Sequence, residues 1–123
     1  MSTSAPRAVV LFAHGSRDPL WHRPIEAVAT SLSLAQPDLA VRCAYLELSE
    51  PDLPTACAGL IASGCQQITV VPVFLGVGRH AREDLPLLIS ELRSQHPTVT
   101  FTLKPAVGED PRLIALLANI AGE

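Results

Sequence analysis

Short apolar runs alternate four times along this chain with segments whose apolar residues recur at helical spacing. The runs predict strands over residues 8–13, 40–46, 68–74 and 99–103. The first and third runs are apolar at almost every position, which is typical of strands buried on both faces. Alternation of this kind predicts an α/β fold with a parallel sheet. Right-handed crossovers then favour one doubly wound domain over residues 1–123, with four parallel strands in the order 2-1-3-4 and helices on both sides.

The segments between the runs carry apolar stripes with spacings of three and four residues. The stripes are Ile25, Val28, Ala29 and Leu32; Leu53, Ala56, Cys57, Leu60 and Ile61; Leu85, Leu88, Ile89 and Leu92; and Leu113, Leu116, Leu117 and Ile120. Each stripe is expected to face the sheet. Acidic residues followed by proline, at 18–19, 50–51 and 110–111, predict helix starts, because a carboxylate complements the free N–H groups of the first turn.

The composition limits the classes of partner. Charged residues make up only 17% of the 123 residues, so we expect some apolar surface to contact a second copy in a homodimer. The net charge of −3, without a cluster of lysines and arginines, argues against nucleic acid binding. Residues 1–6 are expected to form a flexible, polar N-terminus without the features of a signal peptide. No apolar run is long enough to span a bilayer. The two observations together predict a cytoplasmic protein.

The three cysteines are predicted to be core residues. Cys43, Cys57 and Cys65 have no paired spacing and fall in or beside the expected strands and helices. Cysteine often behaves as a small apolar residue in such positions. Neither a disulfide framework nor a thiolate metal site is expected.

Two histidines are the strongest functional signal, because each follows an expected strand. His14 comes directly after the first strand, and His80 is expected in the loop after the third, over residues 75–80. Parallel strands end at one common edge, so the two imidazoles could share a ligand there. Neutral imidazole binds cobalt, iron, nickel and zinc. Glu47, at the end of the second strand, could join them as a ligand or as a proton acceptor. Three ligands suit an open metal site better than a closed structural zinc site, which needs four.

Other interpretations of the histidines remain open at this point. A histidine after the first strand could also carry a phosphoryl group above a helix N-terminus. Histidine phosphatases have arginine before that histidine, whereas this chain has Ala13, which counts against phosphoryl transfer. A non-catalytic module that binds a metal or a tetrapyrrole is a further alternative. His22 is interpreted as a packing or surface residue, and His96 as the end of a helix, with no chemistry assigned to it.

Phosphate-binding and hydrolase motifs are missing or incomplete. Gly15-Ser16 lacks the Gly-Lys-Ser/Thr ending of a Walker loop, and Gly76-Val77-Gly78 lacks the further glycine of a dinucleotide fingerprint. The chain has no GxSxG elbow. The sequence therefore gives no site for ATP.

Three segments resemble the small sirohydrochlorin chelatases. They are Leu-Phe-Ala-His-Gly-Ser-Arg-Asp-Pro at 11–19, Ala-Tyr-Leu-Glu at 44–47, and the stretch 71–86, in which Gly-x-Gly-x-His-x-x-x-Asp-x-Pro follows Val-Pro-x-Phe-Leu. The resemblance covers nearly the whole chain. It implies a chelatase fold and the ATP-independent insertion of a divalent metal into the tetrapyrrole sirohydrochlorin. Cobalt, for cobalamin biosynthesis, is the favoured metal, and iron, for siroheme, or nickel are the alternatives. The metal is a substrate, so no permanent cofactor is implied.

The resemblance also implies roles for individual residues. His14 and His80 would bind the incoming metal, and Glu47 resembles the carboxylate that larger relatives place between their histidines. The carboxylates of the tetrapyrrole would be bound by polar residues beside the histidines, namely Ser16, Arg17, Arg79 and Arg82. Larger chelatases fuse two such modules, whereas this chain resembles the short, homodimeric form.

Overall fold

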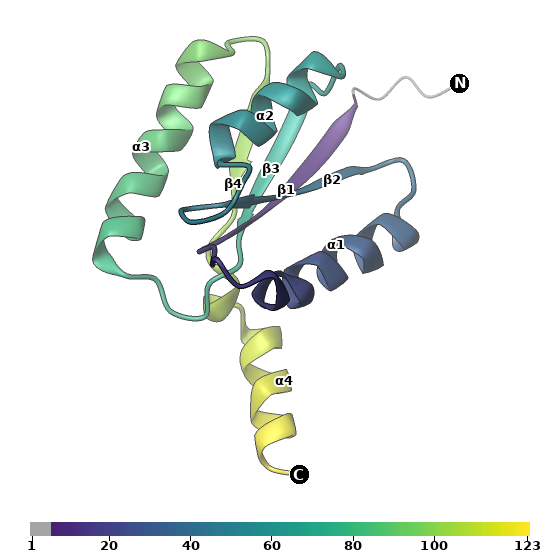
Figure 1. Ribbon diagram of the computed structural model, residues 1–123, viewed down its shortest axis with the longest axis vertical. Helices are drawn as coiled ribbons and strands as arrows, with labels where there is room; N and C mark the ends of the chain where they lie inside the picture. Colours follow the sequence, from purple (N-terminus) through teal and green to yellow (C-terminus); the bar gives the residue numbers. More distant parts are fainter. Residues whose placement is uncertain (1–5) are drawn as a thin grey trace.

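The computed structural model describes residues 6–123. Its strands are β1 (Arg7–Ala13), β2 (Ala40–Tyr45), β3 (Gln67–Pro72) and β4 (Thr100–Leu103). Its α-helices are α1 (Arg23–Ala35), α2 (Leu53–Ala62), α3 (Arg79–Gln95) and α4 (Pro111–Ala121), and two short 3-10 helices are η1 (Pro19–His22) and η2 (Val107–Glu109). Figure 1 shows their arrangement. The expected flexible N-terminus lies outside the described residues except for Pro6, whose carbonyl accepts the Gln66 N–H at 3.0 Å.

The four strands form one parallel sheet in the order β2-β1-β3-β4. The predicted fold class and strand order are therefore confirmed. Strand β1 pairs with β2 and β3, and strand β3 pairs with β1 and β4, so the two most apolar strands are the interior ones. Because all strands are parallel, the loops that follow them share the carboxyl edge of the sheet.

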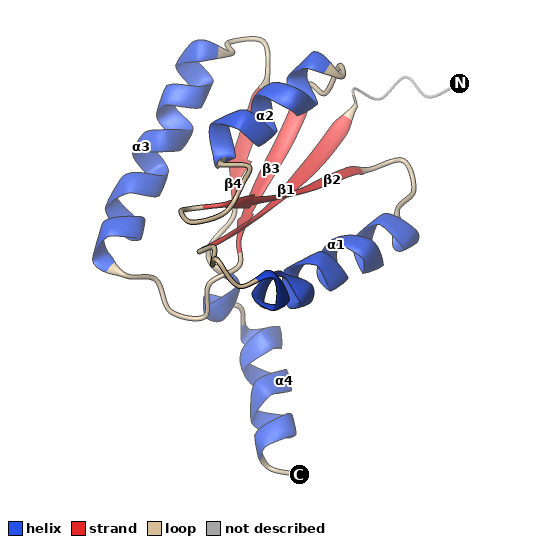
Figure 2. Cartoon of the chain, viewed as in Figure 1, coloured by secondary structure: helices blue, strands red, loops and turns tan. Residues whose placement is uncertain are grey.

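Helices cover the two faces of the sheet unequally. Helices α2 and α3 pack on one face, where Phe12 and Val70 of the strands meet Leu60 and Ile89 of the helices. The other face carries a smaller cluster centred on Ile25 of α1. Figure 2 shows α1 on one side of the sheet and both α2 and α3 on the other. This second face is therefore less completely covered.

Two of the three predicted helix starts are correct. Asp18 and Asp110 accept backbone N–H bonds at the starts of η1 and α4. The prediction at 50–51 is wrong, because α2 begins at Leu53 and its first turn is capped by Asp52, which accepts the Thr55 N–H at 2.9 Å. The better cap lies two residues beyond the Glu50-Pro51 pair, where its carboxylate reaches the first helical turn.

Helix α4 has the expected apolar stripe but does not pack on the sheet of its own chain. None of its residues is buried. In Figure 1 the helix projects away from the sheet, following η2 at the carboxyl edge of β4. The expectation that all four stripes face the sheet is wrong for this helix.

Candidate functional site

His14 is the first residue after β1 and lies at the carboxyl edge of the sheet. Its carbonyl accepts the Glu47 N–H at 2.9 Å, so the pairing of β1 with β2 continues past the ends of both strands. Its imidazole packs against Phe74, with 4.4 Å between the ring centroids. Phe74 is buried, whereas His14 is exposed. The ring is thus supported by the core while it stays open to a ligand.

Gly15 forms the sharp turn that follows His14. Its φ of +101° lies in the left-handed region that favours glycine. A Cβ atom at this position would meet the carbonyl oxygen of Glu47. Only glycine lets the loop after β1 cross this closely over the loop after β2.

Ser49 connects the loops that follow β1 and β2. Its hydroxyl donates to the Ser16 carbonyl at 2.8 Å and accepts the Ser16 N–H at 3.0 Å. The same hydroxyl oxygen lies 2.8 Å from Nε2 of His22. The one hydroxyl proton goes to Ser16, so Nε2 of His22 is the donor in the third contact. These contacts join the Ser16 backbone to the Ser49 and His22 side chains, and this group, the Ser16–Ser49–His22 network, holds the His14 loop to the neighbouring loop.

The network rests on the buried ring of Tyr45. The His22 imidazole lies 4.9 Å from the Tyr45 ring centroid, which agrees with the packing role expected for His22. Burial raises the pKa of Tyr45 to about 12, so its phenol stays neutral at physiological pH and is not a proton acceptor. Sequence reasoning missed Ser49, because a serine in a polar loop carries no signal of a partner 33 residues away.

His80 is the second residue of α3 and is exposed. We expected it in the loop after β3, but the loop ends at Gly78, which precedes the helix with an extended backbone. The loop is held by η2, because the Gly108 N–H donates to the Phe74 carbonyl at 3.0 Å. A Cβ atom at Gly108 would meet the Leu75 carbonyl. Gly108 therefore fixes the approach to His80, and nothing in the sequence pattern indicated this contact.

The structure brings His14 and Glu47 together through their backbones but does not form a preassembled three-ligand site. Within residues 6–123 no group of three or more histidine, cysteine, aspartate or glutamate side chains is arranged to hold a metal ion. Glu47 and both histidines are exposed. Their roles as metal ligands and catalytic groups stay predictions.

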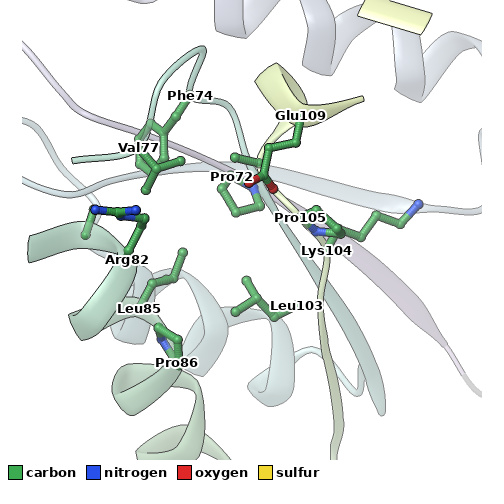
Figure 3. A pocket seen from close by; sticks show the side chains of 12 residues that line it. Pro72, Phe74, Val77, Arg82, Leu85, Pro86, Leu103, Lys104, Pro105 and Glu109 are labelled. Carbon is green, nitrogen blue, oxygen red and sulfur yellow. The ribbon is translucent and has the colours of Figure 1, made fainter. Parts of the chain in front are cut away.

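Arg82 lines a pocket of about 240 Å³ beside the His14 support. The pocket lies between the start of α3 and the segment after β4, and Phe74 and Val77 form part of its wall (Figure 3). Phe74 also packs against the His14 ring, so the pocket adjoins the predicted metal site. Lys104 and Glu109 line it too, and neither was singled out from the sequence. The pocket thus combines a mostly apolar wall with two cations, Arg82 and Lys104, and one carboxylate, Glu109.

The other predicted substrate-binding residues lie on the exposed edge. Arg17 is exposed, and Arg79 forms an exposed ion pair with Glu83, with 3.1 Å between Nε and Oε1. An exposed pair of this kind contributes little to stability, so Arg79 can exchange Glu83 for another carboxylate. Ser16 accepts the Asp18 N–H on its side-chain oxygen at 3.0 Å, which leaves the hydroxyl proton available to a ligand.

The cysteines lie apart from this edge and are free thiols. Cys57 and Cys65 are buried and Cys43 is half-buried, in agreement with the predicted core role. Burial raises the pKa of Cys57 to about 11. A thiol that stays protonated at neutral pH is a poor metal ligand. Among residues 6–123, no helix combines the length and the hydropathy needed to cross a membrane.

Comparison with known proteins finds relatives that are named as chelatases. The chain is 33% identical to the sirohydrochlorin cobaltochelatase of Methanosarcina barkeri over 82 residues, which cover 67% of this chain and 63% of that protein. It thus spans less than two thirds of that relative's length. Among solved structures, a CbiX protein from Marinobacter aquaeolei VT8 is 36% identical, with a TM-score of 0.82 and 95% of both chains covered.

A second solved structure shares the fold at lower identity. It is the sirohydrochlorin chelatase SirB from Bacillus subtilis subspecies spizizenii, in complex with cobalt, with a TM-score of 0.77 and 24% identity. The match covers 92% of this chain and 48% of SirB. The CbiX family model matches residues 8–123, nearly all of the sequence, and the chain therefore belongs to the CbiX family.

Proposed function

We propose that this protein inserts Co²⁺ into sirohydrochlorin in cobalamin biosynthesis. Membership of the CbiX family and the naming of its relatives as sirohydrochlorin cobaltochelatases support this activity. The observation that carries the proposal is the exposed imidazole of His14, held on Phe74 at the edge that also bears Glu47 and His80. Co²⁺ is the favoured metal because the relatives are named for cobalt.

In the proposed reaction His14 and His80 replace water molecules around the incoming ion. Both imidazoles must be neutral to bind it. The ring nitrogens of the tetrapyrrole then replace the imidazoles one by one, and two pyrrole protons leave as the ion enters. Glu47 and an imidazole freed by this exchange can each accept one of the two protons. The exposed position of these side chains supports a transient site, because an ion that is to be handed on needs open coordination positions.

The surroundings suit a large, flat, acidic ligand. Leu46, Leu48 and Leu75 follow β2 and β3 at the carboxyl edge and are exposed, so the face of a macrocycle finds apolar contacts there. Carboxylates at the periphery of the ring would bind the nearby cations and hydroxyl, which are Arg17, Arg79, Arg82 and Ser16. Guanidinium groups suit this role because they bind carboxylates through two parallel hydrogen bonds.

The rival phosphoryl-transfer function gains no support at this edge. Histidine phosphatases have an arginine immediately before the histidine. In this chain that residue is Ala13, which is buried in the sheet. The homodimer and the cytoplasmic location stay predictions.

The test is metal insertion by the purified full chain under anaerobic conditions. Sirohydrochlorin is mixed with Co²⁺, Fe²⁺ or Ni²⁺ in turn, and the absorbance of the tetrapyrrole is followed with and without protein. We expect the largest acceleration over the spontaneous reaction with Co²⁺. Greater acceleration with Fe²⁺ would assign the protein to siroheme synthesis instead. Binding of the tetrapyrrole without any acceleration would indicate a non-catalytic module.

A further inference from the structure

Lys104 follows β4 directly and lies at the carboxyl edge of the sheet. Its backbone N–H donates to the Val70 carbonyl at 3.0 Å, so the pairing of β4 with β3 continues through this residue. The ends of β1 and β2 carry His14 and Glu47, whose backbones pair with each other in a similar way. Lys104 is therefore held at the same edge as the predicted site. It is also the single lysine of the chain.

The pocket that Arg82 lines, the Arg82 pocket, has Lys104 on its other side. Figure 3 shows Arg82 on α3 and Lys104 on the segment after β4, with Pro72, Leu85 and Leu103 among the apolar residues of the lining. The Lys104 side chain is exposed, and its amine extends away from the rim. Its flexible four-carbon stem lets the ammonium turn toward a ligand. Two cations thus flank one mostly apolar pocket.

The positive charges of this pocket exceed its negative charges. Within residues 6–123 neither Arg82 nor Lys104 forms an ion pair with a carboxylate. Asp110, which follows Glu109, is bound by the Arg112 side chain instead. Among the described residues Glu109 is the one carboxylate that lines the pocket. The lining therefore has one surplus positive charge, which a single carboxylate of a ligand would balance.

The pocket lies to the side of the predicted metal site. Phe74 forms part of its wall and packs against the His14 ring, with 4.4 Å between the ring centroids. A tetrapyrrole takes its metal at the centre of the ring and carries its carboxylates on short carbon chains at the rim. A macrocycle centred over His14 therefore has its rim beside the pocket. A volume of about 240 Å³ is small for a whole ligand but sufficient for one such side chain.

We propose that Arg82 and Lys104 bind one rim carboxylate of sirohydrochlorin between them, which makes Lys104 a specificity-determining residue. The inference rests on the proposed function and names the part of the substrate that this pocket recognises. The apolar lining contacts the carbon chain, and the two cations bind its carboxylate. The contact orients the macrocycle from its rim, away from the reacting nitrogens. It therefore stabilises the bound substrate and the transition state equally, and its loss affects KM and not kcat.

The first test uses the single lysine of the chain. The full chain is acetylated with and without metal-free sirohydrochlorin, and mass spectrometry measures the rates at Lys104 and at the α-amino group, which is the internal control. With the tetrapyrrole at about four times its Kd, acetylation of Lys104 alone should slow about fivefold. The absorbance of the tetrapyrrole reports binding in the same samples. An unchanged rate at Lys104 despite binding would overturn this proposal alone, whereas a lack of binding would overturn the proposed function as well.

The second test separates an ion pair from simple coverage of Lys104 by the macrocycle. Lys104→Gln should raise the KM for sirohydrochlorin about fivefold and leave kcat unchanged, and Lys104→Arg, which keeps the charge, should restore KM. Arg42→Gln is the matched control, because it removes one positive charge from β2, at the opposite edge of the sheet from β4. Equal KM values for Lys104→Gln and Arg42→Gln would contradict the proposal. A loss of kcat with an unchanged KM would also contradict it.

Discussion

Nε2 of His22 lies 2.8 Å from the hydroxyl oxygen of Ser49, and this contact completes the Ser16–Ser49–His22 network. The Ser16 N–H, the Ser16 carbonyl and Nε2 of His22, all from the segment after β1, meet at the one hydroxyl of Ser49. The loop that carries His14 is therefore fixed to the loop that carries Glu47 by side chains as well as by backbone pairing. The geometry of the edge therefore depends on Ser49 and His22, which take no part in the proposed chemistry.

Ser49→Ala should lower both stability and metal insertion. The substitution leaves the Ser16 N–H and carbonyl without their partner, at a cost of about 1–3 kcal/mol in unfolding free energy. Urea unfolding measures the loss, with Ser33→Ala on the exposed side of α1 as the control. Ser49→Thr, which keeps the hydroxyl, should recover part of the stability. Equal stability of the Ser49→Ala and Ser33→Ala variants would show that the network is not needed.

Gly15→Ala should be far more harmful than Gly59→Ala. Gly15 has a φ of +101°, and a Cβ there would meet the Glu47 carbonyl, so we expect a loss of at least about 2 kcal/mol. Gly59 lies inside α2, with no atom near the added Cβ, and alanine should stabilise the protein there by about 1 kcal/mol. Thermal unfolding of both variants gives the comparison. Similar melting temperatures would contradict the turn geometry described above.

His14→Ala and His80→Ala should each abolish metal insertion without unfolding the protein. Both side chains are exposed, so their removal leaves little of the core unsupported. The measurement is the rate of Co²⁺ insertion, together with a circular dichroism spectrum for each variant. His96→Ala, at the end of α3, is the control and should keep its activity. Near-normal turnover in either of the first two variants would refute the proposed ligands.

The start of α4 should keep its cap at moderately acidic pH. The Arg112 side chain and backbone N–H hold the pKa of Asp110 at about 2, below its ordinary value of 3.8. A lowered folded-state pKa means that the ionised carboxylate stabilises the fold above the ordinary value, and that this stabilisation is lost as the pH falls through about 2. Carbon NMR of the Asp110 carboxyl group should show this titration. A midpoint near the ordinary value would contradict the contact.

The alternation of apolar runs and helical stripes predicted the sheet, its parallel order and most element positions. The pattern was informative here because β1 and β3 are the interior strands of the sheet and their sequences are almost continuously apolar. The pattern failed where a single hydrogen bond decides the structure. At the start of α2, the cap is the carboxylate of Asp52 and not that of Glu50. It also put His80 in a loop, since Pro86, which lies inside α3, obscured where that helix begins.

The sequence by itself determined the fold class, the family resemblance and the residues that reach the carboxyl edge. These follow from periodicity and from short motifs, which are local properties of the chain. Only the tertiary structure decided that Ser49 and Gly108 hold the two loops, because each meets a partner more than 30 residues away. The structure also decided that α4 stands free of its own sheet. An apolar stripe in the sequence indicates that a helix must bury one face. Only the tertiary structure shows which surface is available to cover that face.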